Sequence, residues 1–285
     1  MMFDYRLLHP RFGVEVVGAD LSRTIDESGC AEILEAFETH SVLLFRGPIL
    51  DDEQQLAFSR WFGEVQVSFS GNQSGATLFS RQSNIDMETD TLMPPDHRQM
   101  KYQEGNRLWH SDSSYRPLGS KCSILSAHET PPSGGDTAFV SLRAAWDGLS
   151  DDMKRRCEGL SAMHALSYSR HLTGFSLTPE QEAEAPSALH PLVRVNPVNG
   201  RKNLFIGSHA SHIDGLPVDE GRRFLGDLLD RATEPAAVYA HAWRDGDVVV
   251  WDNRAVLHRA TPFDATRHRR LMQRTTIVGE AVLTL

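Results

Sequence analysis

The first part of the chain alternates short apolar runs with polar segments. β-branched or apolar runs predict strands at residues 14–17 and 41–45, and apolar positions at helical spacing predict a helix at residues 31–39 between them. Asp51 and Asp52 are suited to cap a second helix that runs to about residue 61. The chain is therefore expected to open with a strand–helix–strand unit and a further helix.

The second half of the chain is rich in short strand-like runs. Strands are predicted at 122–128, 138–140, 162–166, 192–195, 204–206, 238–241, 248–251 and 271–278. Helices are predicted at 142–149, 151–157 and 218–231. Many short strands with a few peripheral helices indicate a mainly β chain, a jelly-roll sandwich or barrel whose mouth can hold a small ligand.

Residues 66–105 differ in composition from the rest of the chain. They are polar and rich in turn-forming residues, and the pattern does not predict a packed sheet there. Two interpretations remain open, a lid over a nearby site and a disordered insertion without a role in function. With 285 residues and 40% hydrophobic content, the chain is expected to form one domain over residues 1–285.

Charge and cysteine content narrow the class of protein. The formal net charge of −9 makes nucleic acid an unexpected partner, because phosphate binding needs a basic surface. Cys30, Cys122 and Cys157 are odd in number and far apart, which favours free thiols in a reducing compartment. The sequence shows neither a secretory leader nor a long apolar run, so we expect a cytoplasmic protein with no membrane partner.

The stretch LWHSDSSY contains the first candidate metal ligands. If it is extended, His110 and Asp112 point to one face, about 7 Å apart along the backbone. A second imidazole, for which His258 is available in WDNRAVLHRA, would complete the two-His-one-carboxylate set of non-haem Fe(II) oxygenases. His-x-Asp pairs also arise by chance, and a strand end with two solvated polar residues is the alternative.

A second group of candidates lies in RRLMQRTT near the end of the chain. Arg270, Met272 and Arg274 share one face of the predicted strand at 271–278. Guanidinium groups on the inward face of a strand need anionic partners, because an unpaired buried charge is costly. Those partners are either carboxylates of the protein or bound carboxylic acids.

Four motifs in this order, LWHSDSSY, PPSGGDTAF, WDNRAVLHRA and RRLMQRTT, resemble the taurine and 2,4-dichlorophenoxyacetate dioxygenase family of Fe(II)- and 2-oxoglutarate-dependent oxygenases. The stretch NLFIGSHASHIDGLP is more similar to the dichlorophenoxyacetate branch than to the taurine branch. The resemblance runs from the first helix to almost the last residue. It implies a double-stranded β-helix core, also called a jelly-roll or cupin-like core.

The resemblance also implies a role for each matching residue. It makes His110, Asp112 and His258 the catalytic iron ligands, Thr137 and Arg270 the residues that hold the distal carboxylate of 2-oxoglutarate, and Arg274 the residue that faces the substrate carboxylate. Arg269 matches the family by raw spacing from His258, whereas Arg270 matches by motif. We prefer Arg270, because only that choice leaves a second arginine four residues later.

Three further residues are weaker candidates for contact with the substrate. His209 and His212 are expected to line the substrate pocket or to support the metal ligands, with ordinary turn histidines as the alternative. Asn106 is expected to make a polar contact near the mouth of the site. The cofactor set implied by the resemblance is Fe(II), 2-oxoglutarate and O2, with ascorbate expected to stimulate.

The implied reaction is hydroxylation of a small anionic substrate. For an aryloxyacetate such as 2,4-dichlorophenoxyacetate, hydroxylation beside the ether oxygen yields a phenol and glyoxylate, with succinate and CO2 from 2-oxoglutarate. The same chemistry on a sulfonate or another aromatic acid stays open. A zinc hydrolase and a non-catalytic acid-binding barrel are the alternatives from other classes, although the hydrolase motif HExxH is absent from the sequence. Length and charge leave open whether the chain forms a homo-oligomer.

Overall fold

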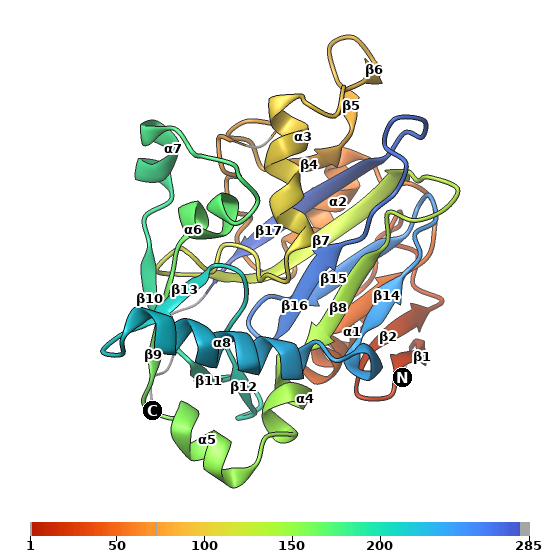
Figure 1. The fold of residues 1–285 in the computed structure, drawn as a ribbon. Helices are drawn as coiled ribbons and strands as arrows, with labels where there is room; N and C mark the ends of the chain where they lie inside the picture. Colours follow the sequence, from red (N-terminus) through yellow and green to blue (C-terminus); the bar gives the residue numbers. More distant parts are fainter. Residues whose placement is uncertain (1, 72, 280–285) are drawn as a thin grey trace.

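The largest sheet combines strands from both ends of the chain (Figure 1). The computed structural model describes residues 2–71 and 73–279. In these residues the sheet has seven strands in the order β1-β2-β3-β15-β7-β17-β4, and β2 and β3 form its parallel pair. The strands are β1 (Asp4–His9), β2 (Phe12–Val17), β3 (Val42–Phe45), β4 (Ser80–Ser83), β7 (Ser120–Glu129), β15 (Val248–Asp252) and β17 (Leu271–Val278).

A smaller sheet packs against the inner face of this large sheet. Its order is β14-β8-β16, with β8 (Thr137–Ser141), β14 (Tyr239–His241) and β16 (Val256–Ala260). One buried cluster contains Leu125 and Val249 from the large sheet together with Phe139 and Val256 from the small sheet. Alternation along each strand turns these side chains inward, so the apolar core between the sheets forms without any helix.

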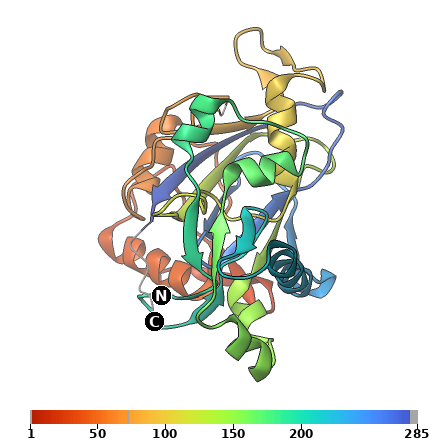
Figure 2. The ribbon, with the colours of Figure 1, turned by 60° about the vertical axis from the view of Figure 1, so that its left-hand side comes forward.

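Two helices cover the outer face of the large sheet. They are α1 (Glu27–His40) and α2 (Asp52–Ser59), and Phe37 and Phe58 pack with Ile124 and Val250 of the sheet. The side chain of Asp51 caps α2 in a capping box, which satisfies two backbone N–H groups at the start of that helix. The turned view shows these helices on one side of the sheets and α8 on the other (Figure 2).

The remaining elements gather around the small sheet and the site. Strands β9 (Ser161–His164), β10 (Ala188–Pro191) and β13 (Ala210–Ile213) form one sheet, and β11 (Val193–Val195) pairs with β12 (Lys202–Leu204). The short pair β5 (Ile85–Asp86) and β6 (Thr91–Leu92) is separate. The helices are α3 (Arg98–Gln103), α4 (Leu142–Asp147), α5 (Asp151–Cys157), α6 (Leu166–His171), α7 (Pro179–Glu184) and α8 (Val218–Ala232), with 3-10 turns η1 (Glu104–Arg107) and η2 (Pro235–Ala237).

The structure is a mixed α/β arrangement of several sheets, which agrees in part with the sequence-based expectation of a mainly β chain with peripheral helices. The strand predicted at 162–166 ends at His164, because α6 begins at Leu166. The helix predicted at 218–231 and the strand predicted at 271–278 are confirmed, since both have a long and regular apolar pattern.

The segment 66–105 is partly built into the large sheet. Strand β4 pairs with β17, with Ser80 opposite Arg274, so a stretch that the polar pattern left unassigned forms the edge of the sheet. Backbone hydrogen bonds to β17 supply the stability that the side-chain pattern lacks. The role of the segment as a lid stays a prediction. In the described part of the chain, the three cysteines are free and no helix has the length and apolar character needed to cross a membrane.

A buried charge network joins α4 to the end of β15. The guanidinium of Arg143 is 1% exposed and donates to Asp252 Oδ2 at 3.0 Å, to Ser41 Oγ at 2.7 Å and to the carbonyl of Glu38 at 2.9 Å. Arg254 shares Asp252 and also bonds Glu38. Because Asn253 follows Asp252 directly, this network fixes the chain beside the candidate metal ligands.

The first prediction tests this network. Arg143→Met should lower the free energy of unfolding by about 3 kcal/mol, because it removes one member of a buried ion pair and one hydrogen-bond donor from each of its three acceptors. Urea unfolding followed by circular dichroism measures the change. The matched control is Arg155→Met, which removes an exposed pair with Asp152 and should change the value by less than about 0.5 kcal/mol. Equal effects of the two variants would contradict the assignment.

Candidate active site

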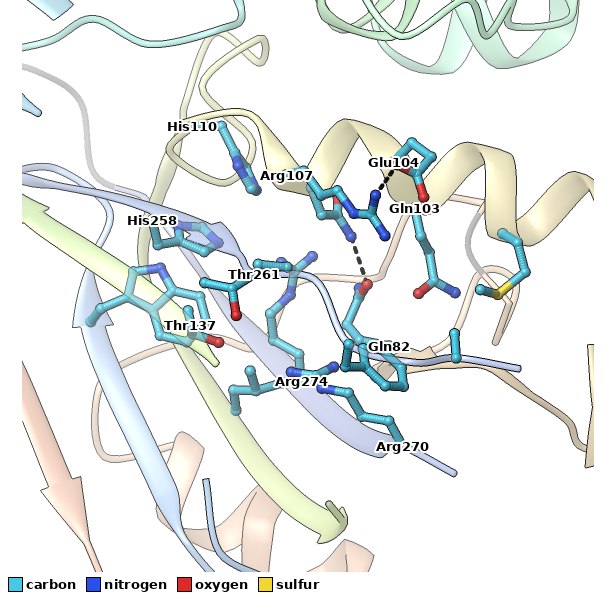
Figure 3. Close-up of a pocket in the computed structure, with 17 residues that line it drawn as sticks. Gln82, Gln103, Glu104, Arg107, His110, Thr137, His258, Thr261, Arg270 and Arg274 are labelled. Atoms are coloured by element: carbon cyan, nitrogen blue, oxygen red, sulfur yellow. Dashed lines mark hydrogen bonds and ion pairs between the residues drawn. The ribbon is translucent and has the colours of Figure 1, made fainter. Parts of the chain in front are cut away.

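Two histidines far apart in sequence are paired through their backbones. The N–H of His110 donates to the carbonyl of His258 at 3.0 Å, and the N–H of His258 donates to the carbonyl of His110 at 2.9 Å. This is the hydrogen-bonded pair of an antiparallel ladder, in which both side chains leave on the same side. The ring centroids are 4.2 Å apart (Figure 3). One bridge beside β16 therefore brings the two imidazoles together.

Asp112 joins the histidines through a turn rather than a strand. The stretch was expected to be extended, but only His110 forms a bridge, and a turn follows in which Ser113 has φ +54°. The N–H of Asp112 donates to Asn253 Oδ1 at 3.1 Å, and Ser123 Oγ donates to Asp112 Oδ2 at 2.7 Å. These two contacts, and not strand alternation, direct the carboxylate toward the imidazoles.

The three side chains form a cluster suited to a metal ion. One ligand atom from each lies within 4.8 Å of the others, and all three residues are buried. His110 Nδ1 donates to the carbonyl of Leu108 at 2.7 Å, which leaves Nε2 with a free lone pair 3.8 Å from Asp112 Oδ1. His258 Nε2 lies 3.7 Å from Asp112 Oδ2. Two imidazoles and one carboxylate on one side match the ligand set of non-haem Fe(II).

The protonation states also fit metal binding. Burial lowers the pKa of His110 and lowers that of His258 well below its usual value, so both rings are neutral. Burial raises the pKa of Asp112, but the guanidinium of Arg274 and the hydrogen bond from Ser123 hold it below its usual value. Neutral imidazoles and an ionised carboxylate are the forms that bind a divalent cation.

A first hollow opens on one side of the cluster. It is bordered by His258 and Trp251, and Thr137 and Arg270 lie deeper in it (Figure 3). Trp243 Nε1 donates to Thr137 Oγ1 at 3.0 Å, and Arg270 Nε donates to the carbonyl of Gly135 at 3.2 Å. These contacts hold both polar groups toward the hollow.

The guanidinium of Arg270 has no carboxylate partner among the described residues. It is 8% exposed, and burial lowers its pKa to about 10. Gly134 and Gly135 both have positive φ, near +70°, and a Cβ on Gly135 would lie 3.2 Å from Arg270 Nε. Gly135 therefore permits the close approach of the turn to the guanidinium. A buried cation of this kind favours a bound anion.

Neighbouring arginines of the same motif lie in different places. Arg269 contacts Glu129 at 2.7 Å and Asp90 at 2.7 Å, outside both hollows. Arg274 lies on the same side of β17 as Arg270, and its Nη1 donates to Asp112 Oδ1 at 2.6 Å. The strand therefore directs one arginine to surface carboxylates and two into the site.

A second hollow also borders His110. It shares Gln82, Asn106, His110 and Arg274 with the first hollow and also contains Asp112. Its apolar wall comes from Val67, Phe69, Tyr102, Tyr115 and Leu166. The wall is therefore aromatic, while the end nearest the cluster is polar and charged.

The weaker candidates divide between the second hollow and its surroundings. Asn106 Nδ2 donates to Gln82 Oε1 at 2.8 Å, and both residues line both hollows. His209 is buried in the second hollow, with its ring 5.9 Å from that of His110. His212 lies on β13, bonds Ser211 at 2.9 Å and lines neither hollow. The structure thus brings Asn106 and His209 to the site but not His212.

Several residues of the site were missed from sequence. Ser123 and Asn253 hold Asp112, and Gln82 and Arg170 line the second hollow. Asn253 had a signal, since it lies five residues before His258 in the same motif. Gln82 and Arg170 had none, because they lie in segments without a regular pattern and reach the site only through the fold.

Comparison with known proteins identifies the family. The family model "Taurine catabolism dioxygenase TauD, TfdA family" matches residues 4–276. The chain belongs to the TauD/TfdA family. The resemblance drawn from the four motifs is thereby confirmed, and so is the expectation of an α-ketoglutarate-dependent dioxygenase, α-ketoglutarate being 2-oxoglutarate.

Relatives match this TauD/TfdA chain over nearly its whole length. The α-ketoglutarate-dependent 2,4-dichlorophenoxyacetate dioxygenase of Cupriavidus pinatubonensis is 42% identical, with 95% of this chain and 96% of the relative covered. The enzyme of the same name from Burkholderia sp. (strain RASC) is 39% identical, with 97% and 95% covered. The solved structure of AAD-2 in complex with Mn(II) and N-oxalylglycine has a TM-score of 0.91 at 37% identity, with 100% of both chains covered.

The second prediction concerns the support of Asp112. Ser123→Ala should weaken Mn(II) binding by about tenfold or more. The reason is that the Ser123 hydroxyl orients the Asp112 carboxylate without binding the metal ion itself. Titration calorimetry measures the affinity. The control is Ser126→Ala on the same strand, whose hydroxyl bonds Gln55 Oε1 at 2.8 Å and should leave Mn(II) affinity unchanged. Unchanged affinity in Ser123→Ala would refute the positioning role.

Proposed function

We propose that the protein is an Fe(II)- and 2-oxoglutarate-dependent dioxygenase that hydroxylates an aryloxyacetate such as 2,4-dichlorophenoxyacetate. The products are a phenol and glyoxylate, with succinate and CO2 from the co-substrate. The observation that carries the proposal is the metal-ligand cluster between two hollows, each of which contains a buried arginine. The two relatives are named as 2,4-dichlorophenoxyacetate dioxygenases, and this supports the choice of substrate.

In this proposal His110, Asp112 and His258 hold the metal ion. Fe(II) bound there would supply oxidation of a C–H bond by O2, coupled to decarboxylation of 2-oxoglutarate. Thr137 and Arg270 bind the distal carboxylate of 2-oxoglutarate in the first hollow, where a guanidinium and a hydroxyl can both donate to it. Ascorbate is expected to stimulate turnover.

The second hollow is the proposed substrate site. Tyr102, Tyr115 and Phe69 provide an aromatic wall for an aryl ring. A substrate packed against this wall would exclude water from the reacting carbon. Arg274 faces the substrate carboxylate from β17. His209 and Asn106 complete the polar edge. A sulfonate would meet the same arginine, so a taurine-like substrate is the second candidate.

The described fold supports the predicted core. The large sheet and β14-β8-β16 face each other across one buried cluster, which supports the double-stranded β-helix, or jelly-roll, inferred from the resemblance. We propose one catalytic domain over residues 1–285. Residues 66–105 act as its lid in this proposal, since Met100, Gln103 and Glu104 near the end of that segment border the first hollow.

A zinc hydrolase is the weaker alternative. It needs a free carboxylate as general base beside the open metal position. Among the described residues, the acids that line the two hollows are Asp112, which is in the cluster, and Glu104, which pairs with Arg107 at 2.8 Å. Neither is a free base at the cluster.

The third prediction tests the substrate class. With Fe(II), 2-oxoglutarate and ascorbate, a panel of phenoxyacetates, cinnamates and taurine should give phenol and succinate together from the phenoxyacetates. Chromatography of both products measures the coupling. Stimulation by taurine alone would reject the aryloxyacetate proposal but keep the reaction class. The absence of succinate under all conditions would reject the dioxygenase itself.

The fourth prediction tests which arginine binds 2-oxoglutarate. Arg270→Met should raise the KM for 2-oxoglutarate by about tenfold or more, because it removes a charge-assisted hydrogen bond in a buried site. Arg269→Met is the matched control, since Arg269 pairs with Glu129 and Asp90 away from the hollow. Steady-state kinetics with a saturating phenoxyacetate gives the comparison. A larger effect in Arg269→Met would reverse the assignment.

A further inference from the structure

Arg170 is a buried cation in the second hollow, and no carboxylate of the described residues pairs with it. It comes from α6, is 5% exposed and lines the hollow together with Arg274. Its guanidinium carbon lies 4.4 Å from the ring centroid of Tyr102, and Nη2 donates to Asn106 Oδ1 at a long 3.4 Å. Its Nε is buried without a hydrogen-bond partner, and no salt bridge to Arg170 occurs among the described residues.

The two arginines of the hollow differ in their partners. Arg274 is already paired with Asp112 Oδ1 at 2.6 Å, so one positive and one negative charge compensate each other there. Arg170 has no carboxylate within salt-bridge distance among the described residues, and its Nε has no hydrogen-bond partner. The uncompensated charge of the second hollow is therefore that of Arg170.

Gly105 leaves the space that the guanidinium of Arg170 occupies. A Cβ added to Gly105 would lie 1.8 Å from Arg170 Nη1, so any larger residue at that position would displace the side chain. Gly105 is in η1, next to Asn106, and its φ is not in the left-handed region. The requirement for glycine at this position thus comes from the arginine and not from the backbone conformation.

We propose that Arg170 joins Arg274 in binding the acid group of the primary substrate, and that the charge of Arg170 gives the second hollow its preference for acids over uncharged compounds. The cation pairs with an anion brought by the substrate, which removes the cost of its unpaired burial. Tyr102 and Asn106 hold the guanidinium in place while Nε and the outer nitrogens donate to the acid. The inference rests on the proposed function, since it assigns the second hollow to the substrate.

The test compares an acid with its amide, which has the same shape and lacks the charge. Binding of 2,4-dichlorophenoxyacetate, cinnamate and the two corresponding amides is measured by calorimetry on protein loaded with Mn(II) and N-oxalylglycine, so that no turnover occurs. The wild type should bind each acid at least about tenfold more tightly than its amide. Arg170→Met should remove most of this preference, and Arg170→Lys should restore part of it.

Two further variants separate charge recognition from packing. Gly105→Ala keeps the charge but displaces it, so it should also reduce the preference for acids. Arg222→Met is the matched control, because Arg222 stacks on Tyr168 and donates to the carbonyl of Ser211 outside both hollows. It should leave the preference unchanged. Thermal unfolding of each variant identifies any that fail to fold.

Every outcome decides the inference. If Arg170→Met weakens acid and amide equally, the residue only supports the wall of the hollow and the proposal is wrong. A wild-type protein without any preference for acids also overturns it. If Arg170 controls the preference but no phenol is released from active Fe(II) enzyme, the aryloxyacetate proposal fails and the role of Arg170 stands.

Discussion

The site depends on one pair of backbone hydrogen bonds between His110 and His258. Each residue both donates to and accepts from the other, so neither can turn without breaking two bonds in a buried place. The pairing requires β16 and the segment before Asp112 to lie side by side, which is possible only when the two sheets have closed around their common core. The two histidine ligands are therefore held by backbone hydrogen bonds, whereas Asp112 is held by the side chains of Ser123 and Asn253.

Charge balance organises what surrounds this pair. Asp112 compensates Arg274, whereas Arg270 and Arg170 are buried without a carboxylate partner in the described chain. Each unpaired guanidinium lies in a different hollow, so an anion can be bound on each side of the metal cluster. A protein interior tolerates such charges only at a cost in stability, which a bound acid offsets. The same feature that makes the empty fold less stable thus prepares it for two acidic ligands.

Contacts from the outer layers help to hold the metal-ligand cluster in place. Helices α1 and α2 bury the back of the large sheet, and the network of Arg143, Asp252 and Arg254 ties α4 to the end of β15. Asn253 is the next residue, and its amide holds both the backbone of Asp112 and the hydroxyl of Ser123. Ser123 in turn donates to the carboxylate. A continuous set of short contacts therefore links the helical layer to one metal ligand.

The sequence by itself determined the features that depend on local pattern. Alternation placed Arg270 and Arg274 on one face of β17, helical spacing defined α8, and the motifs identified His110, Asp112 and His258 as one set. Tertiary structure alone decided the turn at Asp112, the pairing of β4 with β17 and the entry of Arg170 into the site. The physical reason is that these features arise from hydrogen bonds and burial between segments distant in the chain, which leave no period in the sequence of either segment.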